Sequence, residues 1–146
     1  MRVVIQRVRQ GNVKVHGATI AKIGLGLMIL LGVGPEDGDD QIEYLVNKIS
    51  NLRIFEDEEG KIIRSVLDVG GEAIVISQFT LYADTRKGRR PSFTKAAPPD
   101  IASPLVDQFA ECLADTGVPT QKGEFGAHMH VEIHNDGPVT IWMERS

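Results

Sequence analysis

Residues 26–34 read GLMILLGVG, a continuous apolar run that is bounded by glycines and followed by Pro35. An uninterrupted run of this length is typical of a β-strand that is buried on both faces. The stretch EAIVISQFTLYA at 72–83 is a second strongly apolar strand, and further polar residues enter at its C-terminal end. The first run therefore predicts a strand at the centre of a sheet.

The segments on either side of these runs predict further strands and a helix. Apolar residues fall on both parities of the opening stretch, and Asn12 to Ile23 then alternates loosely around Gly17, which together indicate a β-hairpin or meander. Apolar residues at helical spacing predict a helix over about 39–51. Between about 54 and 64, the sequence predicts two short strands, and Gly60 supplies the left-handed residue of their turn.

The second half of the chain begins with a long loop from Asp84 to Pro104, which contains four prolines and no periodicity. The pair Ser103-Pro104 predicts the N-cap and first residue of a second helix. From about residue 120 the pattern indicates strands again: AHMHVEIHN (127–135), a turn at NDGP, and a returning VTIWME (139–144).

Composition places the chain among ordinary single-domain globular proteins. It has 146 residues, of which 42% are hydrophobic and 25% charged. No apolar run reaches the roughly 18 residues needed to span a bilayer, and the N-terminus is unlike a signal peptide. The single cysteine, Cys112, agrees with a reducing compartment. We therefore expect a cytoplasmic protein that does not enter a membrane.

The charge distribution is uneven. The net charge is −4, yet the segment DTRKGRRPSFTK (84–95) carries five basic residues and one acid. An acidic body with one basic loop favours a localised anionic ligand over general coating of nucleic acid. A solvated loop that happens to be basic is the alternative. The candidate anion-binding residues are Arg86, Lys87, Arg89 and Arg90.

Two sets of side chains could carry chemistry. His128, His130, Glu132 and His134 share one face of a probable strand, which suits either a metal site or a solvated face, and no further ligand is evident. Ser77 and Thr80 lie at the polar end of a buried strand, but no His or Lys neighbours them in sequence to accept a proton. No glycine-rich phosphate loop or nucleophile elbow is present, and no cofactor is expected.

The Gly137-Pro138 pair offers a structural alternative to a plain hairpin turn. A peptide bond before proline can be cis at a cost of only about 0.5–1 kcal/mol. Cis geometry would point neighbouring carbonyls the same way, as a rigid pair of acceptors.

Two separated segments, SQFTLYA (77–83) and NDGPVT (135–140), resemble the two signature motifs of the D-aminoacyl-tRNA deacylase family. The resemblance covers the whole chain, including MRVVIQRV at the start, GRRPSF (88–93) and FGAHM (125–129). It implies an α/β fold with two barrel-like β-sheet layers that are covered on one side by helices. We expect one domain over residues 1–146.

The resemblance also implies a function: hydrolysis of the ester that joins a D-amino acid, or glycine, to the 3′-terminal ribose of tRNA. It implies a homodimer in which a cis Gly137-Pro138 reaches into the partner's pocket and excludes L-amino acids. Ser77 and Gln78 would line the substrate site. The N–H groups of Phe79 and Thr80 are our candidates for oxyanion donors.

Within this scheme the attack on the ester has two versions. The ribose 2′-hydroxyl could assist it, or Thr80 could act as a covalent nucleophile. The basic loop would contact tRNA phosphates, and neither DNA nor a metal is expected. Two other classes remain open: a metal-dependent hydrolase that uses His128 and His130, and a tRNA-binding module without catalysis.

Overall fold

The computed structural model describes all 146 residues and places the apolar run at its centre. β3 (Gly26–Gly32) pairs antiparallel with β1 (Arg2–Val15) and parallel with β6 (Glu72–Ser77). The sheet order is β2-β1-β3-β6-β7, and β8 also pairs with β1. The remaining strands of this sheet are β2 (Ala18–Ile23), β7 (Thr120–Lys122) and β8 (Met129–Glu144). The predicted central position of the run is confirmed.

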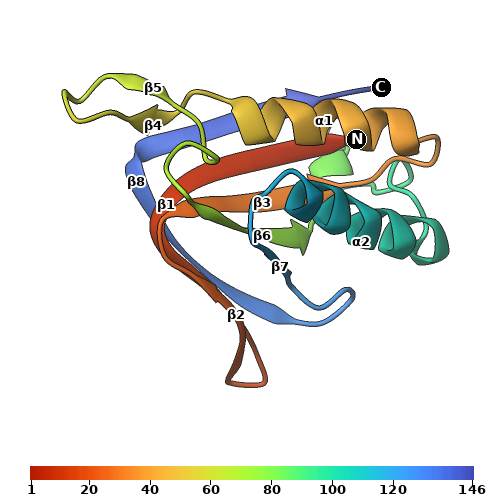
Figure 1. Ribbon diagram of the computed structural model, residues 1–146. Helices are drawn as coiled ribbons and strands as arrows, with labels where there is room; N and C mark the ends of the chain where they lie inside the picture. The colour runs from red at the N-terminus through yellow and green to blue at the C-terminus, as the bar shows by residue number, and fades with distance from the viewer.

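The central strands bury both of their faces, as their composition requires. Leu27 and Ile29 belong to one core, whereas Met28 between them belongs to a second core on the other face. β1 contributes to both: Ile5 lies in the first core and Val13 in the second. Figure 1 shows β1 and β8 curving together away from the helices, so that the sheet folds back over itself. The α/β fold with barrel-like sheet layers is confirmed.

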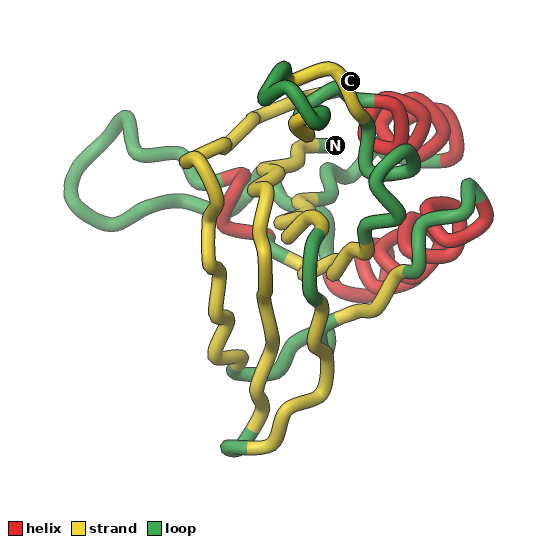
Figure 2. Tube along the Cα trace, turned by 60° about the vertical axis from the view of Figure 1, so that its left-hand side comes forward, coloured by secondary structure: helices red, strands yellow, loops and turns green.

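Both long helices cover the first core, from the same side of the sheet (Figure 2). α1 (Asp39–Asn51) has the predicted extent. α2 (Pro99–Asp115) begins five residues before the predicted start, so that prediction is wrong. Pro98-Pro99 provides an earlier N-terminus with proline at the first position, because the N–H of Ala102 bonds to the Pro98 carbonyl at 2.9 Å. Pro104 consequently lies inside the helix.

The predicted hairpin after α1 is confirmed. β4 (Phe55–Glu56) and β5 (Ile62–Arg64) form a separate two-stranded sheet that projects from one end of the molecule in Figure 1. Gly60 in their turn has a φ of 81°, the left-handed conformation that favours glycine. No helix in the structure has the length and apolar character to cross a membrane.

The predicted turn at NDGP is wrong, because β8 continues through it along β1. Asn135 pairs with Val8 and Thr140 pairs with Gln6, so residues 136–139 bulge out of the ladder opposite Arg7. β1 is long enough to pair with both halves of β8, which leaves no reason for the chain to reverse. The segment is a strand with a bulge.

Candidate functional site

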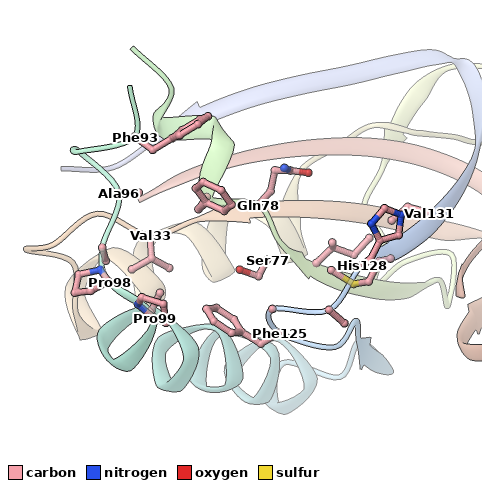
Figure 3. A pocket seen from close by; sticks show the side chains of 17 residues that line it. Val33, Ser77, Gln78, Phe93, Ala96, Pro98, Pro99, Phe125, His128 and Val131 are labelled. Atoms are coloured by element: carbon pink, nitrogen blue, oxygen red, sulfur yellow. The ribbon is translucent and has the colours of Figure 1, made fainter. Parts of the chain in front are cut away.

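A cavity of about 650 Å³ lies between the end of β6, the beginning of α2 and the segment that leads into β8. Its walls are mostly apolar, and Figure 3 shows Phe93 and Pro98 at one end and His128 at the other. The lining residues include Ser77, Gln78, Phe79, Pro99, Phe125 and Met129. An apolar hollow with a few polar groups is the usual form of a small-molecule site.

The polar edge of this cavity is formed where β6 ends. The N–H of Gln78 donates to the Leu31 carbonyl (2.7 Å), after which the chain turns into η1, the short 3-10 helix Phe79–Tyr82. η1 can pack this close to β3 only because residue 32 is glycine. A Cβ there would lie 3.1 Å from the Gln78 carbonyl oxygen and 3.1 Å from the Leu81 Cβ. Gly32 therefore sets the position of the segment predicted to be catalytic.

Two aromatic rings stand at the mouth of the cavity. Phe79 and Phe93 meet edge to face, with ring centroids 5.0 Å apart and planes at 73°. The Phe79 side chain is nevertheless 54% exposed, which is unusual for a large apolar residue. Exposed aromatic faces next to a hollow can stack on a flat ligand such as a nucleobase.

Thr80 lies beside the cavity and is not among its lining residues. Its Oγ1 accepts a hydrogen bond from Nε2 of Gln78, and no hydrogen bond joins it to a histidine or a carboxylate. A hydroxyl oxygen that accepts a hydrogen bond is a weaker nucleophile, and no base is placed to remove its proton. Of the predicted site residues on this segment, the structure thus brings Ser77, Gln78 and Phe79 to the cavity and leaves Thr80 at its edge.

Gly137 and Pro138 lie elsewhere, on the exposed bulge of β8, and neither lines the cavity of the same chain. Their peptide bond is cis, as the resemblance implies. Arg7 connects the bulge to the rest of the fold, because its Nε donates to the Asp136 carbonyl (3.0 Å) and its Nη1 donates to the Ile54 carbonyl (2.7 Å). Across the bulge itself, the Val139 N–H donates to Oδ1 of Asn135 at 2.8 Å.

The basic loop is exposed, and its one acidic residue, Asp84, is bonded to one of its basic residues. Arg86 donates to both carboxylate oxygens of Asp84, at 2.9 and 2.6 Å. These hydrogen bonds hold the pKa of Asp84 well below its ordinary value. Arg89 and Arg90 are exposed and make no ion pair, so they remain available to an anionic ligand.

The histidines of the C-terminal strand face outward, as one of the two sequence interpretations expects. His128, His130 and His134 are exposed, and Glu132 is half-buried. No group of three or more His, Cys, Asp or Glu side chains is arranged to hold a metal ion. His128 has a different significance, because it lines the cavity.

Several site residues escaped the sequence analysis. Pro98, Pro99 and Phe125 form cavity walls but carry no chemistry of their own that a pattern could reveal. Arg7 did leave a signal, because it has the parity of Val3 and Ile5 on β1 and is therefore a basic residue at a buried position. A buried arginine requires specific acceptors, which here are the two carbonyls described above and the Asp136 carboxylate, 3.6 Å from Nη2.

Comparison with known proteins gives consistent matches along the chain. The family model described as D-Tyr-tRNA(Tyr) deacylase matches residues 4–144. A D-aminoacyl-tRNA deacylase from Thermomicrobium roseum is 58% identical over 99% of this chain and 94% of its own length. One from Limosilactobacillus reuteri is 50% identical over 99% of this chain and its full length.

Solved structures agree with these sequence matches. The c-Myc DNA unwinding element binding protein superposes with a TM-score of 0.94 at 44% identity, covering 100% of this chain and 99% of its own. A probable eukaryotic D-amino acid tRNA deacylase has the same fold, with a TM-score of 0.83 at 18% identity over 97% of each chain. On the family match and the identities together, this chain belongs to the D-Tyr-tRNA(Tyr) deacylase family.

Proposed function

We propose that this chain, as one domain over residues 1–146, hydrolyses the ester bond between a D-amino acid and the 3′-terminal ribose of tRNA. The observation that carries the proposal is the cavity bordered by Ser77, Gln78 and Phe79, in a chain whose relatives are named D-aminoacyl-tRNA deacylases. Its volume of about 650 Å³ suits a nucleoside with an attached amino acid. The exposed ring of Phe79 provides a stacking surface for the terminal base.

The reaction needs little from the protein, because an aminoacyl ester is already activated. A water molecule attacks the ester carbonyl, the developing oxyanion accepts hydrogen bonds, and the ribose oxygen leaves with a proton. We assign the oxyanion donors to the main-chain N–H groups of Phe79 and Thr80. The ribose 2′-hydroxyl adjacent to the ester assists the attack, which agrees with the lack of a side-chain base bonded to Thr80.

Selection against L-amino acids is assigned to the main chain of Gly137 and Pro138 from a second copy of the chain. Both residues are exposed on the bulge of β8, and neither lines its own chain's cavity. They can contact a substrate only by entering the cavity of another protomer, so we propose a homodimer. Backbone acceptors that contact the α-carbon would reject L-amino acids whatever their side chain is, and they would also admit glycine.

We assign binding of the tRNA acceptor stem to the basic loop. Lys87, Arg89 and Arg90 would contact acceptor-stem phosphates, while the acidic remainder of the chain limits general nucleic-acid binding. Because aminoacyl-tRNA is made and used in translation, we place the protein in the cytoplasm.

The direct test compares matched D-tyrosyl-tRNA and L-tyrosyl-tRNA as substrates. We expect hydrolysis of the D-form and near-complete survival of the L-form, with glycyl-tRNA hydrolysed as well. Equal hydrolysis of both stereoisomers would contradict the assignment, and binding of both without hydrolysis would favour a tRNA-binding module. Loss of activity on treatment with EDTA, restored by added metal, would favour the metal-dependent alternative.

A further inference from the structure

A second hollow, which we call the histidine pocket, opens beside the cavity. It has a volume of about 580 Å³ and no hydrophobic lining residue. It is lined by Lys14, His16, Gly17, His128, His130 and Glu132. His128 also lines the cavity, at the end away from Phe93 (Figure 3), so the two hollows share a wall.

The register of β1 against β8 builds this pocket. Lys14 is opposite His130, and Asn12 is opposite Glu132, so their side chains share one face of the sheet. His16 and Gly17 form the turn between β1 and β2, with φ values of 50° and 78°. This left-handed turn carries the His16 side chain to the same hollow.

Glu132, the one acidic residue of the pocket, accepts hydrogen bonds from β1. Oε1 of Glu132 accepts from Lys14 (3.2 Å) and Oε2 accepts from Asn12 (2.9 Å). These hydrogen bonds lower the pKa of Glu132, so it stays ionised and fixes Lys14. Lys14 has three donors and uses one. His16, His128 and His130 form no side-chain hydrogen bond or ion pair, so their imidazoles face the pocket with free N–H groups.

We propose that the histidine pocket binds the phosphodiester groups that lead into the 3′-terminal nucleotide of tRNA. The inference rests on the function proposed above, because the terminal nucleoside must occupy the cavity. Its 5′-phosphate then lies toward the Phe93 end or toward the His128 end, and the lining favours the second. The Phe93 end is lined by Ala96, Pro98 and Pro99, which offer no side-chain donor, and the basic loop beyond it is assigned above to the acceptor stem. The His128 end opens onto Lys14 and three imidazoles, whose N–H groups match phosphate oxygens.

This site is separate from the basic loop and compatible with it. The 3′ end of tRNA is single-stranded and flexible, so its phosphates can lie in the histidine pocket while the acceptor stem contacts Arg89 and Arg90. The pocket would thus position the ester by holding the strand next to it.

The experiment compares 3′-O-(D-tyrosyl)adenosine, which has no phosphodiester, with the trinucleotide CCA carrying D-tyrosine, which adds two cytidines and the phosphodiesters that join them to the adenosine. For Lys14→Ala and His130→Ala we expect KM for the trinucleotide to rise about 3- to 10-fold, as the loss of one ordinary hydrogen bond at an open site gives. The loss in kcat/KM should be confined to this substrate. Glu132→Gln should act in the opposite direction and lower KM for the trinucleotide, because it removes the one negative charge of the pocket.

His134→Ala is the matched control, since His134 lies on the same strand and face but does not line the pocket. It should change neither substrate's kinetics. Equal losses on both substrates, or none on the trinucleotide, would overturn the proposal. So would inhibition by inorganic phosphate that depends on Lys14 while trinucleotide kinetics do not, because the pocket would then hold a free anion. Binding of uncharged CCA, followed by fluorescence, tests the pocket even if hydrolysis fails, which separates this inference from the proposed function.

Discussion

Nε of Arg7 donates a hydrogen bond to the main-chain carbonyl of Asp136, 3.0 Å away, immediately before Gly137-Pro138. Arg7 is only 4% exposed, and its Nη1 donates a hydrogen bond to the Ile54 carbonyl. One buried guanidinium thus connects the bulge of β8 to the body of the fold. The orientation of the proposed stereochemical filter depends on a residue that does not belong to it.

Replacement of Arg7 should therefore disturb both stability and selectivity. Arg7→Ala leaves two carbonyl acceptors without their donor, and we expect it to lower the free energy of unfolding by about 3 kcal/mol, measured by urea denaturation. Arg7→Lys should fold more stably than Arg7→Ala but show a reduced D-over-L ratio of kcat/KM, because one ammonium cannot serve both carbonyls in the same geometry. The matched control is Arg9→Ala: Arg9 also approaches Asp136 (3.4 Å) but is 80% exposed, so its removal should cost less than about 1 kcal/mol. Equal effects of the two alanine variants would show that the bulge does not depend on the buried hydrogen bonds.

Local sequence patterns correctly predicted the elements in which every residue of a face is buried against the same core. The run at 26–34 had to be central because it is apolar on both faces, and α1 followed from a single apolar stripe. The errors occurred where two local signals compete. Pro98-Pro99 and Ser103-Pro104 both fit a helix start, and only packing of α2 onto the core selects the first. Asn-Asp-Gly-Pro is an excellent turn sequence, but pairing of β8 along the whole of β1 overrides it.

The site divides in the same way. The motif segments at 77–83 and 135–140 were identified from resemblance, whereas the cavity itself was not, because its walls come from four separate segments. Ala97 and Phe125 become neighbours of Ser77 only through tertiary structure, and nothing in their local sequence indicates it.

Gly32→Ala tests whether the close approach of η1 to β3 matters for activity. An added Cβ would sit 3.1 Å from the Gln78 carbonyl oxygen, so η1 must move outward by a few tenths of an ångström. We expect kcat for D-tyrosyl-tRNA to fall about 10-fold or more, since oxyanion donors act only within a narrow distance. Gly24→Ala is the control, because its Cβ would meet only a backbone oxygen at 3.9 Å. If Gly32→Ala kept full kcat, the position of η1 would be unimportant for the chemistry.

Stability should fall in acid partly through Asp84. Hydrogen bonds from Arg86 lower the pKa of Asp84 in the folded protein, so its carboxylate favours folding above the unfolded value of about 3.9. That contribution decreases as the pH falls below this value toward the folded pKa. Between pH 5 and about pH 2 the urea midpoint of the wild type should therefore decrease more than that of Asp84→Asn. Parallel pH profiles of the two proteins would show that the pair with Arg86 adds nothing to stability.

Removal of Arg89 and Arg90 tests the basic loop. If each neutralises one phosphate, the double alanine variant should bind tRNA more weakly and lose up to about two units of slope in a plot of log affinity against log salt. Turnover at saturating tRNA should change little. A double replacement of Lys48 and Lys61, which removes the same charge from α1 and the β4-β5 turn, controls for net charge and should leave the slope nearly unchanged. Equal effects of the two double variants would show that the basic loop is a solvated surface that does not contact tRNA.

Thr80 distinguishes the two versions of the chemistry. Its Oγ1 accepts a hydrogen bond from Gln78, and neither a histidine nor a carboxylate of the same chain is bonded to it, so no side-chain base is in place to activate the hydroxyl as a nucleophile. The main-chain N–H of residue 80 does not depend on the side chain, so Thr80→Ala retains the oxyanion donor that we propose. We therefore expect Thr80→Ala to keep at least about a tenth of the wild-type kcat, because only the side-chain contact with Gln78 is lost. A D-tyrosyl-tRNA analogue whose terminal ribose lacks the 2′-hydroxyl should lose far more, about 100-fold or greater, since general acid-base assistance contributes on that scale. A collapse of Thr80→Ala with full activity in Thr80→Ser, together with a D-tyrosyl-enzyme ester detected by mass spectrometry, would instead establish Thr80 as the nucleophile.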